Sequence, residues 1–229
     1  MAVAEAPQGF AEKAFFEYHL YTLGRRTDLP NHSTKQIELI PTASGVNCQK
    51  ELVFAPTLAF GMYGNPQLGQ EFGRYSKGEV NVYLRFANEK KHGLGVPMPA
   101  GRIRVNQLDE ADGNLEFIGE DVIDHTPRNE DVLIRLGNAF DVVGERIQTD
   151  FRADSKTRNL WETFEIKLRN HKDQEVTVAV LENLYRSSNW KIEDVNHPFN
   201  KENSKQIRFD VKVPSEGETV IRYTVHYSW

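Results

Sequence analysis

The sequence predicts an all-β protein built from two tandem antiparallel β-sandwich modules of the immunoglobulin-like kind. Hydrophobic and polar residues alternate with a period of two along many short stretches. Turn-forming residues separate these stretches at intervals of roughly 8 to 12 residues, the spacing typical of sandwiches and barrels. Few stretches of the sequence show the 3.6-residue hydrophobic period of a helix. At 229 residues, 39% of them hydrophobic, the chain can bury the cores of two ordinary domains.

The first expected strand lies near the N-terminus. A short helix over residues 9–18 is conceivable, but Phe15, Phe16 and Tyr18 favour strands and lead without a break into residues 19–23. We therefore interpret this segment as a strand.

Alternation is clearest in later stretches, where hydrophobic side chains point one way and polar ones the other. Such a pattern predicts antiparallel strands with one face on a core and one in water. The stretches cover residues 80–86, 164–169, 176–180, 207–213 and 221–227. Asp112-Gly113 predicts a hairpin with a type I′ turn, because that turn needs positive φ at both central residues.

The domain boundary is expected near residues 150–158, where Asp154, Ser155 and Lys156 interrupt two periodic stretches. This places one module at residues 1–152 and the other at 153–229. One continuous elongated sandwich is the alternative. Residues 61–78 are rich in glycine and have no usable period, so we expect a long loop there, and long ordered loops often carry function.

Composition excludes several classes of function. The net charge is −5, and basic residues occur in pairs beside acids, not in the stripe that neutralises nucleic-acid phosphates. No apolar run approaches the roughly 20 residues of a membrane helix, and the N-terminus lacks a signal-peptide pattern. Cys48 is the only cysteine, so an intrachain disulfide is impossible. We expect no cofactor, no nucleic acid and no membrane span.

Several segments carry a resemblance to a known family. They are GLGVPMPAG at 93–101, GEDVIDHTP at 119–127, AFDVVGER at 139–146, EIKLRNHKD at 165–173 and the closing residues 223–229. In order and spacing they resemble the bacterial domain of unknown function that forms the C-terminal part of mucoidy inhibitor A-like proteins. The resemblance implies an exported or envelope-associated protein and assigns no catalytic residue. The upstream region of that family, which often contains coiled coil, has no counterpart in this sequence.

Two histidines are candidate metal ligands. Asp124 and His125, with His171 and Asp173 elsewhere, are the residue types that bind a metal through nitrogen and oxygen. Neighbouring strand residues face opposite sides, so Asp124 and His125 share an ion only at a turn. We favour a hydrogen bond from His125 to a loop backbone, with a metal site as the alternative.

Two further polar groups have structural alternatives that we favour. Glu145-Arg146 could pair a carboxylate with a guanidinium to hold a glycan or another carboxylate, but an ion pair or backbone clamp that pins neighbouring strands is the simpler interpretation. Four oxygen-bearing residues around Gly113 crudely resemble a calcium loop, although their spacing does not fit one and a hairpin tip explains them. They are Asp109, Glu110, Asp112 and Asn114.

Aromatic residues offer a possible stacking surface for a glycan. The candidates in and beyond the 61–78 loop are Tyr63, Phe72, Tyr75, Tyr185, Trp190 and Trp229. Trp161 and Trp190 serve equally well as core residues.

The leading hypothesis from sequence is a non-catalytic structural or interaction module at the bacterial envelope or outside the cell. Sheets with open edges accept an added strand, and residues 10–23 are a plausible donor. This predicts a homo-oligomer or filament, or binding to envelope proteins, with Phe10, Phe15, Phe16 and Tyr18 as contact residues. A glycan-binding module is the first alternative and a metal-dependent hydrolase around His125 and His171 the second.

Overall fold

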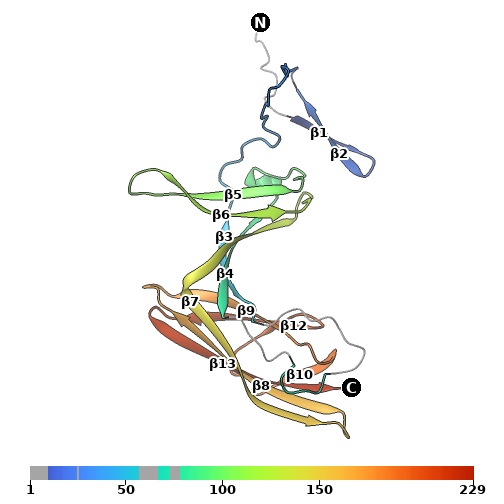
Figure 1. The fold of residues 1–229 in the computed structure, drawn as a ribbon, viewed down its shortest axis with the longest axis vertical. Coiled ribbons are helices and arrows are strands. Elements are labelled where there is room, and N and C mark those ends of the chain that lie inside the picture. Colours follow the sequence, from blue (N-terminus) through green and yellow to red (C-terminus); the bar gives the residue numbers. More distant parts are fainter. Residues whose placement is uncertain (1–9, 25, 57–66, 73–77) are drawn as a thin grey trace. The chain divides into compact units, whose positions relative to one another are not determined.

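The regular secondary structure of the described residues is almost entirely strands, as Figure 1 shows. The computed structural model describes residues 10–24, 26–56, 67–72 and 78–229. In these residues the only helical element is the single-turn 3₁₀ helix η1 (Lys90–His92). The predicted all-β class is confirmed. No helix in the described parts is long and apolar enough to cross a membrane.

Thirteen strands are present in the described residues. They are β1 (Phe10–Phe15), β2 (Tyr18–Leu23), β3 (Gln49–Phe54), β4 (Glu79–Ala87), β5 (Gly101–Leu108), β6 (Leu115–Ile123), β7 (Asp131–Asp154), β8 (Asn159–Asn170), β9 (Val176–Asn183), β10 (Asn189–Glu193), β11 (Asn200–Asn203), β12 (Gln206–Val213) and β13 (Gly217–Ser228). Each of the five clearest alternating stretches lies in one of them.

The strands form one large sheet and two ribbons. The large sheet has nine strands in the order β10-β13-β8-β7-β4-β3-β9-β12-β11. β1 pairs with β2, and β5 pairs with β6, each pair as a separate two-stranded ribbon. β3 runs parallel to β9, with Leu52 opposite Val178, so the sheet is mixed and the expectation of purely antiparallel strands is wrong at this pair.

The chain separates into two compact units with interleaved segments. Unit 1 contains residues 1–49, 85–104 and 120–134, and unit 2 contains residues 50–84, 105–119 and 135–229. The predicted boundary between residues 152 and 153 falls inside β7, close to its turn into β8. Two tandem immunoglobulin-like sandwiches are not confirmed.

Unit 2 holds the main hydrophobic core, because its sheet curls until β12 contacts β8 and β13. Every second residue of β8 is buried on the inner face. The ring of Tyr223 on β13 lies 5.6 Å from Phe164 on β8 and 5.7 Å from Phe209 on β12, measured between centroids. These aromatic contacts join the two halves of the curled sheet.

The two edge strands of the large sheet, β10 and β11, are short and lie close together. Trp190 of β10 donates its indole N–H to the carbonyl of Ser204, which follows β11, at 2.7 Å. The ammonium of Lys201 on β11 lies 4.5 Å from the centre of the same indole. Short length and charged side chains are common devices that keep a sheet edge from pairing with another chain.

A buried ion pair crosses the core between β7 and β9. The Arg146 guanidinium donates to the Glu182 carboxylate at 2.9 Å, and both side chains are almost fully excluded from water. The Tyr223 hydroxyl donates to the same carboxylate oxygen. Burial raises the pKa of the Glu182 carboxyl, and the Arg146 charge opposes that rise.

The expected ion pair that pins neighbouring strands is confirmed, and Glu145 and Arg146 each have a separate partner. Glu145 and Arg146 are neighbours on β7, so their side chains face opposite sides of the sheet. Glu145 lies 3.6 Å from Arg169 on the partly exposed face, whereas Arg146 reaches Glu182 inside.

A second buried pair holds a loop in place. Arg186 donates to the Glu162 carboxylate at 2.7 Å, and Gln148 donates to the same oxygen at 2.8 Å. Arg186 also donates to the backbone carbonyls of Gly69 and Phe72, at 2.9 and 3.1 Å. This arginine therefore fixes the described residues 67–72 of the expected long loop.

Removing Glu182 should destabilise unit 2 strongly, because it leaves the Arg146 charge buried without a partner. We expect Glu182→Ala to lower the free energy of unfolding by about 3 to 5 kcal/mol in chemical denaturation. The control is Glu145→Ala, whose ion pair is partly exposed, and its expected cost is below about 1 kcal/mol. Equal effects of the two variants would contradict this account.

Candidate interaction surface and pocket

The N-terminal ribbon has two chemically different faces. In its register Glu12 is opposite Tyr21, and Phe15 is opposite Tyr18. Residues 16 and 17 make the turn, where Phe16 adopts a left-handed φ of 56° that non-glycine residues rarely adopt. The expected strand is confirmed, but residues 10–23 form two strands paired with each other.

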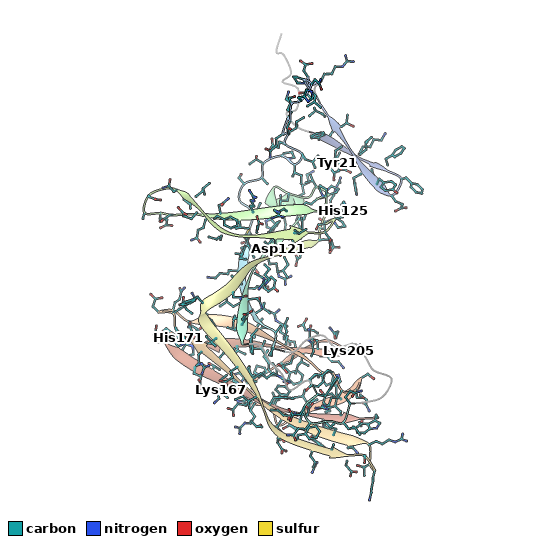
Figure 2. The ribbon with its side chains drawn as sticks, viewed as in Figure 1. Tyr21, Asp121, His125, Lys167, His171 and Lys205 are labelled. Atoms are coloured by element: carbon teal, nitrogen blue, oxygen red, sulfur yellow. The ribbon has the colours of Figure 1, made fainter. Side chains whose placement is uncertain are left out.

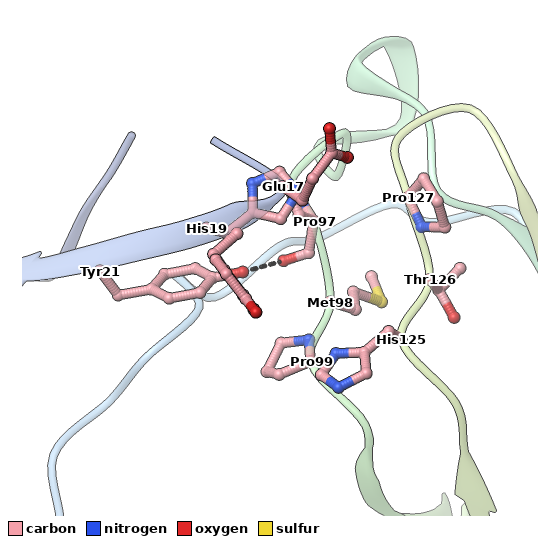
Figure 3. Close-up of a pocket in the computed structure, with 10 residues that line it drawn as sticks. Glu17, His19, Tyr21, Pro97, Met98, Pro99, His125, Thr126 and Pro127 are labelled. Carbon is pink, nitrogen blue, oxygen red and sulfur yellow. Dashed lines mark hydrogen bonds between the residues drawn. The ribbon is translucent and has the colours of Figure 1, made fainter. Parts of the chain in front are cut away.

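One face of the ribbon, the anchored face, is attached to the rest of unit 1. The Tyr21 hydroxyl donates to the carbonyl of Pro97 at 3.0 Å (Figure 3). The Glu12 carboxylate contacts His19 at 2.7 Å and accepts a hydrogen bond from Arg128. The hydrogen bond with His19 is the main reason that the pKa of Glu12 is lowered, and Arg128 adds to it.

The opposite face of the ribbon, the exposed face, is apolar and uncovered. Exposed fractions are 64% for Phe15, 73% for Tyr18 and 51% for Leu20, and Phe16 at the turn reaches 88%. Because the ribbon has only two strands, the outer edge of each also lacks a strand partner among the residues that the structure describes. Phe10, which we expected among the contact residues, is half-buried and lies on the anchored face.

A pocket of about 470 Å³ lies inside unit 1, against the turn end of the ribbon (Figure 3). Its far wall is made by Met98 and Thr126, whose backbones exchange two hydrogen bonds of 2.9 Å. Most of the lining is apolar or aromatic, with a few polar side chains. The lining residues are Glu17, Tyr18, His19, Tyr21, Pro97, Met98, Pro99, His125, Thr126 and Pro127.

The glycine- and proline-rich segment behind this wall is held rigidly. The side chain of the buried Asn88 donates to the carbonyls of Val96 and Pro127 at 2.7 and 2.8 Å and accepts from the Gly95 N–H at 2.9 Å. Gly95 has a φ of +81°, and a Cβ there would lie 2.6 Å from the backbone nitrogen of Lys90. The segment is therefore both a rigid connector and part of the pocket wall.

The two candidate metal histidines belong to different units (Figure 2). The Ala100 N–H donates to His125 Nδ1 at 3.2 Å, which is the kind of backbone contact favoured from the sequence. Asp124 is exposed beside it, and His171 lies in unit 2. In the described part of the chain, no three His, Cys, Asp or Glu side chains gather closely enough to hold a metal ion.

The aromatic candidates of the long loop are only partly described. Tyr63 and Tyr75 lie outside the described residues. The ring of Phe72 packs edge-on against Tyr185, with centroids 5.7 Å apart. Trp190 is half-buried against the core of unit 2. Phe72 and Trp190 therefore use much of their surface within the protein.

The β5–β6 ribbon ends in an acidic loop. Asp109 donates its N–H to the carbonyl of Asn114 at 2.8 Å and accepts from the Gly113 N–H at 2.8 Å, so the predicted hairpin is confirmed. The predicted type I′ turn is wrong, because Gly113 has positive φ and Asp112 does not. The Asp109 and Asp112 carboxylates accept backbone N–H groups of this loop. The hydrogen bonds from the backbone and side chain of Asn114 lower the pKa of Asp112. These hydrogen bonds fix the shape of the turn.

The same end of β5–β6, which we call the acidic tip (residues 105–119), also exposes apolar side chains. Exposed fractions are 55% for Leu108, 69% for Leu115 and 59% for Phe117. The tip has four acidic residues and no Lys or Arg. The tip therefore combines negative charge with uncovered hydrophobic area.

Comparisons with models of protein families, with curated proteins and with solved structures find no match to this chain.

The pKa of Glu12 should respond to its partners. Glu12 helps to fix the ribbon while it is ionised, so this contribution is present above the ordinary glutamate pKa and is lost as the pH falls through the lowered one. His19→Ala should raise the pKa of Glu12 towards its ordinary value, and Arg128→Gln should raise it less. Carboxyl titration by NMR measures both shifts. An unchanged titration in His19→Ala would show that the hydrogen bond between Glu12 and His19 does not form.

Proposed function

We propose that this protein is a non-catalytic interaction module that assembles with other copies of itself through the β1–β2 ribbon. The observation that carries the proposal is the exposed face, where Phe15, Tyr18 and Leu20 are uncovered on a ribbon whose two edges have no strand partner in the described part of the chain. The resemblance to the mucoidy inhibitor A-like family supports a place at the bacterial envelope or outside the cell.

Elementary energetics favours coverage of this ribbon by a partner. An isolated two-stranded ribbon is marginally stable in water, and each free edge presents unpaired N–H and C=O groups. An added strand satisfies those groups, and neighbouring side chains supply specificity. Full burial of one large apolar side chain contributes about 1.5 to 3 kcal/mol. Phe16 adds an aromatic ring at a strained turn, a feature that is concentrated at functional sites.

The large sheet is a poorer acceptor than the ribbon. Its edge strands β10 and β11 are short, and Trp190 links them through Ser204 and Lys201. Strand addition at those edges would have to displace these contacts. The ribbon requires no such rearrangement.

Removal of the exposed aromatics should abolish assembly. We expect wild-type protein to form oligomers whose mass rises with concentration in light scattering. The triple variant Phe15→Ser, Phe16→Ser, Tyr18→Ser should remain at the monomer mass of 26.3 kDa. Leu29→Ser removes a side chain that is 69% exposed outside the ribbon, and it should assemble like wild type. If the triple variant assembles normally, the proposal fails.

Glycan binding at the pocket of unit 1 is a second candidate function. Its volume of about 470 Å³ falls within the range of small-ligand sites. Tyr18 and Tyr21 offer aromatic surface, and His125 and Glu17 offer polar groups, which together suit a sugar ring.

Calorimetry with a panel of envelope oligosaccharides tests this second function. Binding should weaken about five- to tenfold in His125→Ala, because one hydrogen bond to the ligand is lost. His171→Ala, which alters the other unit, should bind like wild type. The absence of heat with every oligosaccharide, or equal losses in both variants, would exclude glycan binding at the pocket.

A further inference from the structure

The pocket of unit 1 has an unbalanced negative charge at its rim, beside its apolar and aromatic surface. Resting on the second candidate function, glycan binding at this pocket, we infer that the ligand is an amino sugar, that is, a sugar whose free amino group is protonated. The sugar ring occupies the pocket, and the ammonium group lies at the carboxylate of Glu17.

Glu17 supplies the negative charge. Among the described residues that line the pocket it is the only acid, and none of these residues is Lys or Arg. Glu17 has no hydrogen bond or ion pair with another described residue. It is exposed, and Figure 3 shows its carboxylate at the upper edge of the lining side chains. The carboxylate therefore stands at the rim, where both solvent and a bound ligand can reach it.

Neighbouring charges do not offset that of Glu17. The Glu12 carboxylate accepts a hydrogen bond from Arg128, so these two charges compensate each other. His19 turns its Nδ1 atom to the same Glu12 carboxylate, at 2.7 Å. The rim of the pocket therefore has a negative potential, which attracts cationic ligands and repels anionic ones.

His125 supplies an uncharged hydrogen-bond donor. The Ala100 N–H donates to His125 Nδ1 at 3.2 Å, so this nitrogen carries no proton. In a neutral imidazole the proton then lies on Nε2, which is a donor. Nε2 has no hydrogen-bond partner among the described residues. A hydroxyl or ring oxygen of a sugar can accept this hydrogen bond.

Tyr21 supplies an aromatic surface with a fixed orientation. Its hydroxyl donates to the Pro97 carbonyl at 3.0 Å, and its ring is half-buried. The C–H groups on one face of a sugar ring pack against such a surface. Met98, which is 8% exposed, adds an apolar wall. The pocket thus offers an apolar surface to the sugar ring, a donor to a sugar oxygen and a carboxylate to an ammonium group.

This arrangement discriminates among three kinds of sugar. A neutral sugar uses the aromatic surface and His125 only, whereas an amino sugar adds an ion pair with Glu17. An acidic sugar brings a second carboxylate close to that of Glu17. Because exposed ion pairs contribute little, we expect a modest preference of about two- to fivefold for an amino sugar over a neutral one at low salt.

Calorimetry on the full-length protein with three matched probes tests the inference. The probes are disaccharides of glucosamine, glucose and glucuronic acid with the same linkage, titrated near neutral pH at low salt. The glucosamine disaccharide should bind most tightly and the glucuronic acid disaccharide least tightly. Added salt should bring the three affinities together, because it screens exposed charges.

Glu17→Gln removes the charge and keeps the size of the side chain. It should weaken binding of the glucosamine disaccharide about two- to fivefold, to the level of the glucose disaccharide, and leave the latter unchanged. The control is Glu110→Gln, which removes an exposed acid in unit 2 and should bind all three probes like wild type. Circular dichroism and thermal melting confirm that both variants are folded.

The outcomes separate the inference from the function on which it rests. Equal affinity of the wild type for the three probes overturns the selection for an amino sugar and leaves glycan binding standing. A preference that persists in Glu17→Gln, or that Glu110→Gln reduces equally, overturns the role of Glu17. If none of the probes binds, the inference is overturned, and the wider oligosaccharide panel decides whether glycan binding fails with it.

Discussion

The outer N–H and C=O groups of an edge strand need partners, and this requirement shapes both units. In unit 2 the nine-stranded sheet curls so far that its two edge strands come together at Trp190. The rings of Phe209 and Tyr223 fill the space between the two halves. In the ribbons β1–β2 and β5–β6 no third strand formed by the described residues covers the edges. Among the described residues, side chains thus link the sheet edges in unit 2, whereas the edges of the ribbons are open.

The interior of unit 2 also contains buried ion pairs. Arg146 and Glu182 lie among aromatic side chains, as do Arg186 and Glu162, so each ion is excluded from water and depends on its partner. Such pairs add little net stability compared with well-packed apolar residues. They do fix the arrangement of nearby segments, however, because Arg186 also donates hydrogen bonds to backbone carbonyls of residues 67–72. These two buried ion pairs therefore hold residues 67–72 and the neighbouring strands in one arrangement.

The contacts within unit 1 differ from those in the core of unit 2. Its contacts with the N-terminal ribbon are few and polar, chiefly Tyr21 with Pro97 and Glu12 with Arg128. These contacts hold the anchored face and create a pocket beside it, and they leave the apolar face uncovered. A ribbon fixed on one side and open on the other suits a partner-binding role.

Much of the fold followed from local sequence. The period-two alternation in β8, β9, β12 and β13 predicted strands, because one face of each packs on a core and the other meets water. Asp112-Gly113 predicted a hairpin, although the turn around it is wider than a type I′ turn. The aromatic residues Phe15, Phe16 and Tyr18 predicted both a strand and a set of contact residues for a partner.

What the sequence determined by itself was the class of structure and the position of most strands, since alternation is a property of neighbouring residues. Tertiary structure decided every partnership between distant residues. It joined Arg146 to Glu182 instead of Glu145, placed His125 and His171 in separate units, and drew Trp190 into the closure of the sheet. Strand order and sheet curvature set these contacts, and neither is encoded in the spacing of residues along one strand.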